Sequence, residues 1–161
     1  MIRLALLALI MTLGNPAGAV AQSGQAPPPP PTPQPSITLP PDLDAVLRAY
    51  EREWGARSAK GLASLFTEDG FVLQPGRMPV RGTEAITKAY EGSGGPLALR
   101  ALAYATADTV GYIIGAYAPT PGDQDIGKFI LLLRRRPGGG PWRIAADMDN
   151  GNARRGPPPP P

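Results

Sequence analysis

The chain has 161 residues, no cysteine, no histidine and a formal net charge of +3. The lack of cysteine excludes disulfides and thiol chemistry, and the lack of histidine excludes Ser-His triads and the commonest zinc ligand. So small a charge does not favour nucleic acid as a partner. Any catalysis would therefore depend on Asp, Glu, Tyr, Lys or Arg.

The first 21 residues have the pattern of a secretory signal peptide. Arg3 precedes an apolar run at 4–13, and Ala-Val-Ala at 19–21 is the small-x-small pattern that signal peptidases cut. The apolar run is about half as long as the roughly 20 residues that a bilayer core needs. We therefore expect cleavage before Gln22, a periplasmic or secreted protein, and no stable membrane anchor in the mature chain.

Two proline-rich segments flank the part of the chain that can fold. Residues 22–36 and 153–161 are predicted to be a disordered linker and a disordered tail, because proline lacks the amide donor that helices and sheets need. A spacer role is favoured for these segments, and a ligand for a proline-binding module is the alternative. The predicted domain spans 37–152.

Three helices are expected in the first half of this domain. The first lies between Pro41 and Gly55, the second starts after Ser58 as its N-cap and stops near Gly70, and the third is capped by Thr83. The first helix has an apolar stripe at helical spacing: Leu43, Val46, Leu47, Tyr50 and Trp54. Glu68 and Asp69, adjacent in sequence, are interpreted as the end of the second helix and not as an acid pair.

Strands are expected after and between these helices. A short strand is predicted at 71–74, and four longer ones at 97–106, 110–118, 126–135 and 142–150, joined by short turns. This pattern predicts an α+β fold with helices on one face of a curved, mostly antiparallel sheet and a hollow at its open end. The basic run at 134–136 is interpreted as solvated charge at a strand end.

Four segments of the chain, in order, resemble one known superfamily. They are residues 50–54; "GLASLFTEDGFVLQPG" at 61–76; "VRGTEAI" at 80–86; and "GKFILLLRRRPGGGPWRIAADMDN" at 127–150. Together they resemble the nuclear transport factor 2-like superfamily, and specifically its SnoaL-like branch. This resemblance implies a cone-shaped half-barrel with a cavity, and a homodimer formed through the outer face of the sheet. It implies no single activity, because the fold serves enzymes, transport adaptors and association domains.

Ketosteroid isomerase is the best defined enzyme with the fold that this resemblance implies. The match places Tyr50 at the isomerase's oxyanion-hole tyrosine, although a core aromatic is the alternative for this residue. The same register places Gln74 at the general base and Gly127 near the second oxyanion donor. An amide has no useful basicity and glycine has no side chain, so this isomerase chemistry is not expected.

The last predicted strand supplies the remaining polar candidates. Strict alternation puts Trp142, Ile144, Ala146 and Met148 on one face, and Arg143, Ala145, Asp147 and Asp149 on the other. By the resemblance the second face borders the cavity, so Asp147 is expected there, with Asn150 at the rim if the strand bulges. An ion pair of Asp147 with Arg143 or with a neighbour across the hairpin is the alternative. Two carboxylates are too few for a calcium site, and no metal or cofactor is expected.

The leading hypothesis is a non-catalytic domain that binds a small, partly apolar molecule. Trp54 and Tyr112 are candidate aromatic walls of the cavity, with plain core packing as the alternative. A second hypothesis is a cavity lyase, isomerase or hydrolase that uses Asp147 and Tyr50. A third is a protein–protein association module.

Overall fold

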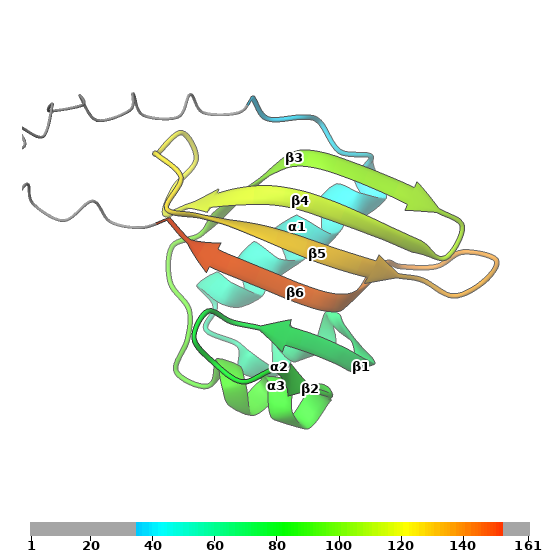
Figure 1. Ribbon diagram of the computed structural model, residues 1–161, viewed down its shortest axis with the longest axis horizontal. Coiled ribbons are helices and arrows are strands. Elements are labelled where there is room, and N and C mark those ends of the chain that lie inside the picture. The colour runs from blue at the N-terminus through cyan, green and yellow to red at the C-terminus, as the bar shows by residue number, and fades with distance from the viewer. Residues whose placement is uncertain (1–34, 153–161) are drawn as a thin grey trace, which may run out of the picture. The chain divides into compact units, whose positions relative to one another are not determined.

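The computed structural model describes residues 35–152. The predicted signal peptide, the tail at 153–161 and all but Pro35 and Ser36 of the predicted linker lie outside the described residues. Three helices and six strands make up the described part (Figure 1). They are α1 (Pro41–Gly55), α2 (Ala59–Ser64), β1 (Phe66–Leu73), β2 (Val80–Arg81), α3 (Thr83–Tyr90), β3 (Ala98–Ala107), β4 (Val110–Ala118), β5 (Gly127–Arg134) and β6 (Arg143–Gly151). No helix within 35–152 is long and apolar enough to cross a membrane.

The predicted apolar stripe is the buried side of α1. Pro41 opens the helix, where a missing amide proton is harmless, and Asp42 and Asp44 lie in the first turn, where negative charge is favourable. The predicted cap of α2 is also confirmed, because Ser58 Oγ accepts a hydrogen bond from the Gly61 amide at 3.0 Å. The predicted cap of α3 is wrong, since Gly82 holds that position with φ 88° and Thr83 is the first helical residue.

The second helix is shorter than predicted, and this moves the acidic pair into a strand. α2 ends at Ser64, and Phe66 begins β1 by pairing with Ile144 of β6. Glu68 and Asp69 therefore lie within β1, in the stretch between Phe66 and Phe71 where the register with β6 shifts. The pairing of Phe66 with a distant strand outweighs the local helical pattern, which the sequence alone does not reveal.

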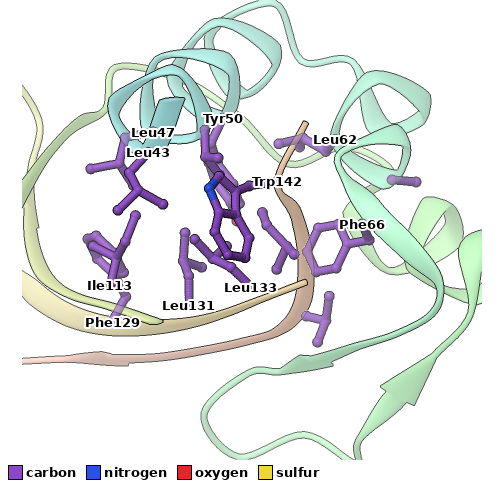
Figure 2. Packing of buried hydrophobic residues seen from close by; sticks show 14 of the residues in the cluster. Leu43, Leu47, Tyr50, Leu62, Phe66, Ile113, Phe129, Leu131, Leu133 and Trp142 are labelled. Carbon is purple, nitrogen blue, oxygen red and sulfur yellow. The ribbon is translucent and has the colours of Figure 1, made fainter. Parts of the chain in front are cut away.

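The strands form a single curled, unclosed sheet in the order β2-β1-β6-β5-β4-β3 (Figure 1). β1 runs parallel to β6, and every other neighbouring pair is antiparallel, so the predicted α+β class is confirmed. Figure 2 shows how α1 packs on the sheet: Leu43, Leu47 and Tyr50 point from the helix toward Ile113, Phe129 and Leu131. Burial of these side chains in one cluster stabilises the fold without a disulfide.

A bulge in β6 corrects the predicted faces of that strand. Leu133 pairs with Ile144 and Leu132 pairs with Ala146, so Ala145 is an extra residue on β6. The alternation therefore restarts after Ala145. Ile144, which is fully buried, lies on the same inner face as Asp147 and not on the opposite one, while Met148 is half exposed on the outer face.

The outer face of the sheet exposes a row of large apolar side chains on neighbouring strands. These residues form cross-strand pairs between β4, β5 and β6, and each is 37–50% exposed. We call them the outer apolar patch: Tyr112, Ile114, Ile130, Leu132 and Met148. A continuous apolar surface of this kind is typical of an interaction site.

Candidate functional site

Helix α1 brings two aromatic rings to the inner face of the sheet. Tyr50 and Trp54 are four residues apart, so both lie on the same side of the helix, and their rings stack with centroids 6.3 Å apart. Tyr90, the last residue of α3, meets the edge of Trp54 at 6.2 Å and an interplanar angle of 87°. Two helices thus build one aromatic wall.

A cluster of three polar side chains lies at the inner end of this wall. Tyr50 donates a hydrogen bond to Oδ2 of Asp147 at 3.0 Å, and Tyr90 donates to the same oxygen at 3.2 Å. The two hydroxyl oxygens are 3.0 Å apart. Each phenol has a single proton, so when both donate to Asp147 neither can donate to the other. We call these residues the tyrosine–aspartate cluster.

The electrostatics of this cluster follow from its burial. Desolvation raises the pKa of the Asp147 carboxyl to about 6, as does the nearby charge of Asp149, although the hydrogen bonds from Tyr50 and Tyr90 lower it. Burial, followed by the charge of Asp147, raises the pKa of both tyrosine hydroxyls far above their ordinary value. The tyrosines therefore remain protonated donors at neutral pH, whereas Asp147 titrates close to neutrality.

The cluster forms the polar end of a pocket between the helices and the inner face of the sheet. The pocket has a volume of about 160 Å³. Its apolar lining comes from β3 and β5 and from the segment just before β3: Leu97, Leu99, Phe129 and Leu131. Its other lining residues are Tyr50, Trp54, Gln74, Tyr90, Tyr117, Asp147 and Asp149. The arrangement combines an apolar body with polar groups concentrated on one side, as small-molecule sites commonly do.

A second tyrosine–carboxylate pair lies beside the first. Asp149 is half buried, and desolvation raises its pKa against a hydrogen bond from Tyr117, which lowers it. Burial and the charge of Asp149 raise the pKa of the Tyr117 hydroxyl in turn. Two carboxylates, Asp147 and Asp149, therefore face one small pocket.

Gln74 reaches the pocket directly after the end of β1. Its side-chain oxygen is buried and has no hydrogen-bond partner among the described residues. This is the residue that the isomerase register placed at the general base, and an amide there can accept or donate a hydrogen bond but cannot take up a proton near neutral pH. Its buried oxygen is therefore an acceptor that no described residue uses.

The predicted site residues do not all meet at this pocket. The structure brings Tyr50, Trp54, Gln74 and Asp147 to it, and Asp147 makes its hydrogen bonds to tyrosines and not to Arg143. Tyr112 lies on the outer face of the sheet, since its neighbour Ile113 is fully buried on the inner face. Asn150 is exposed at the end of β6 and does not line the pocket.

Tyr117 is the aromatic residue of β4 that lines the pocket in place of Tyr112. The two tyrosines are five residues apart, so they face opposite sides of the strand. The strand register leaves room for its ring: Tyr117 pairs with Gly127, where an added Cβ would lie 2.1 Å from the Tyr117 ring. Tyr90 is not recognisable from the sequence as a partner of Asp147, because only the fold brings its side chain, at the end of α3, within reach of β6.

Metal binding finds no support in this part of the chain. No group of three or more Asp or Glu side chains within 35–152 is placed to hold a metal ion. Two carboxylates alone fall short of the oxygen ligands that calcium requires. The lining of the pocket offers hydrogen-bonding groups, negative charge and apolar contact.

No protein-family model matches the sequence, and no curated protein matches it. Solved structures do resemble it. A ketosteroid isomerase-like protein from Erwinia carotovora atroseptica SCRI1043 has a TM-score of 0.58 at 18% identity, over 69% of this chain and 94% of that chain. An NTF-2-like protein of unknown function from Shewanella oneidensis MR-1 has a TM-score of 0.55 at 18% identity, over 67% and 95%. A putative scytalone dehydratase from Novosphingobium aromaticivorans DSM 12444 has a TM-score of 0.54 at 17% identity, over 71% and 87%.

The protein has the nuclear transport factor 2-like fold. The resemblance predicted from the sequence is thereby confirmed for the fold. Because the identities are below 20% and one fold serves many functions, the activities of these proteins cannot be assigned to this chain. The pocket is the feature of this chain that bears on its function.

Proposed function

We propose that this domain binds a small molecule with about one ring in the pocket beside the tyrosine–aspartate cluster. The main support for this proposal is the pocket of about 160 Å³, which has apolar walls and polar groups on one side. A cavity of about 150 Å³ in another protein accepts benzene, which sets the scale. A multi-ring ligand would need the larger volume, about 300 Å³ or more, that drug-sized pockets have.

The chemistry of the pocket supports binding in one orientation. The apolar side of the ligand would contact Leu97, Leu99 and Phe129, where burial of its surface is favourable. Its polar group would meet Asp147, whose Oδ2 already accepts both tyrosine hydrogen bonds while no described residue donates to Oδ1. The buried oxygen of Gln74 is a second acceptor on the same pocket.

The test is ligand-detected NMR with a library of one-ring compounds. Replacing Leu97 by Trp fills the pocket from its partly buried wall and is expected to abolish binding. Replacing Leu132 by Trp makes the same change on the outer face and is the matched control, which should bind as the unmodified protein does. Binding that is unchanged in Leu97→Trp, or no binding by any one-ring compound, would refute the proposal.

A second candidate function is proton transfer in the same pocket, and the contact between Tyr50 and Asp147 favours it. A carboxyl with a pKa near 6 is suited to accept or release a proton at neutral pH, and a neighbouring phenol can donate to a developing oxyanion. Enzymatic activity of the lyase, isomerase or hydrolase type would use these two groups. The measurement is exchange of acidic C–H protons of a bound ligand in D₂O, which Asp147→Asn should abolish if the pocket is catalytic.

A further inference from the structure

The pocket is negatively charged, and nothing in its lining balances that charge. Asp147 and Asp149 both face it, and its lining includes neither Lys nor Arg. Neither carboxylate forms an ion pair with a Lys or Arg of the described residues. Asp147 is 94% buried, since only 6% of its surface is exposed. A buried carboxylate without a cationic partner is costly, because burial removes the water that would stabilise its charge.

The remaining lining suits an organic cation. The rings of Tyr50, Trp54, Tyr90, Tyr117 and Phe129 border the same pocket. The face of an aromatic ring attracts a positive charge, most strongly that of Trp. Carboxylates together with aromatic faces therefore attract a positive group from two sides.

The acceptor oxygens of the pocket also favour a ligand that donates hydrogen bonds. The hydroxyl protons of Tyr50 and Tyr90 are both directed at Oδ2 of Asp147. The buried oxygen of Gln74 lacks a hydrogen-bond donor among the described residues. An ammonium group has several N–H donors and no acceptor, so it complements such a surface better than a hydroxyl or a carboxylate does.

A metal ion fits this lining poorly. Aside from the two carboxylates, the pocket offers a single amide oxygen and phenol groups, and its walls are apolar. Calcium requires about six to eight oxygen ligands, and magnesium retains several waters, which apolar walls cannot hydrogen-bond. The positive group is therefore expected to belong to an organic molecule.

We propose that the ligand of this pocket is a small organic cation, an ammonium group on an apolar body of about one ring, with the ammonium beside Asp147 and Asp149. The two carboxylates are two residues apart on β6 and beyond its bulge, so both face the pocket from the same side of the strand. The apolar body lies against Leu97, Leu99 and Phe129. This inference rests on the proposed function and adds the charge of the ligand to it.

Calorimetry with three probes of similar size tests the inference: benzylammonium, benzyl alcohol and benzoate. At about pH 8 Asp147 is ionised, because its pKa is about 6. Benzylammonium is expected to bind about tenfold more tightly than benzyl alcohol, since hydrogen bonds to charged groups are stronger than neutral ones. Benzoate is expected not to bind, because it brings a third negative charge. Equal or tighter binding of the alcohol overturns the charge assignment and leaves the proposed function standing, whereas binding of no probe overturns both.

Variants locate the cation. Asp149→Asn and Asp147→Asn each remove one negative charge with little change of shape, and each is expected to reduce the preference for benzylammonium while benzyl alcohol still binds. Asp44→Asn is the matched control, because Asp44 pairs with Arg48 on the exposed side of α1, and it should leave the preference unchanged. Circular dichroism confirms that each variant is folded. Loss of the preference in either pocket variant supports the inference, and retention in both overturns it.

Discussion

Replacing Asp147 by Asn is expected to stabilise the protein at alkaline pH. The folded-state pKa of about 6 lies above the ordinary carboxyl value of 3.8. The folded protein therefore binds more protons than the unfolded chain between about pH 4 and 6, and this group lowers the free energy of unfolding as the pH rises through that window. An asparagine keeps the shape and can still accept from Tyr50 and Tyr90, but it never carries the charge.

The size of the effect follows from the same shift. The rise of the Asp147 pKa from 3.8 to about 6 corresponds to about 3 kcal/mol at pH values above both. Desolvation is the largest cause, and the hydrogen bonds from Tyr50 and Tyr90 offset part of it. The Asp147→Asn variant should thus exceed the unmodified protein in stability by up to about 3 kcal/mol near pH 8, and the difference should vanish near pH 4.

Urea denaturation at several pH values measures this difference directly. The control is Asp44→Asn, whose half-exposed carboxylate pairs with Arg48 and whose removal should change stability by less than about 1 kcal/mol. An Asp147→Asn variant that is less stable than the unmodified protein near pH 8 would refute the reasoning. It would mean that the tyrosine hydrogen bonds to the carboxylate outweigh its desolvation. The gain in stability would accompany a weaker preference for a cationic ligand, since the same charge is proposed to hold the ammonium group.

Further predictions concern packing, capping and assembly. Gly115→Ala should lower stability by about 1–3 kcal/mol in denaturation experiments, since its Cβ would lie 2.2 Å from the Phe129 ring and 2.5 Å from a backbone oxygen. Gly55→Ala, with open space around it, should instead raise stability by up to about 1 kcal/mol. Ser58→Ala removes the cap of α2 and should cost about 1 kcal/mol in the same assay. We also propose that the outer apolar patch joins two copies of the chain, so Leu132→Lys should convert a dimer to a monomer in light scattering; a monomeric unmodified protein would contradict this.

Local sequence patterns predicted the secondary structure correctly where one face of a helix or strand is buried along several helical turns or several paired residues. The apolar stripe of α1 predicted its inward side, and alternation predicted the four long strands and the α+β class. The helix boundary at Ser64 was not predictable from such a pattern, because Phe66 pairs with Ile144, a residue far along the chain. Short segments of this kind take the structure that their distant partner allows.

The pocket was predictable in part. Tyr50 and Trp54 follow from the helical stripe, and Asp147 follows from its place on the last strand, although the bulge at Ala145 reverses the faces of the residues before it. Tyr112 is the tyrosine of β4 that the sequence suggests as a cavity wall, whereas Tyr117 lines the pocket. Only the register of that strand against its neighbours, with glycine opposite Tyr117, separates the two.

The sequence by itself determined the chemical limits of this protein: an α+β domain with no histidine or cysteine, and an amide, not a carboxylate, at Gln74. Those limits depend on residue identity and local periodicity, which need no coordinates. Only the tertiary structure decided that Tyr90 joins Tyr50 on Asp147, and that Asp149 faces the same pocket. These contacts join residues 40 to 97 positions apart, and hydrogen bonds and burial at that separation are set by how the helices and the sheet pack.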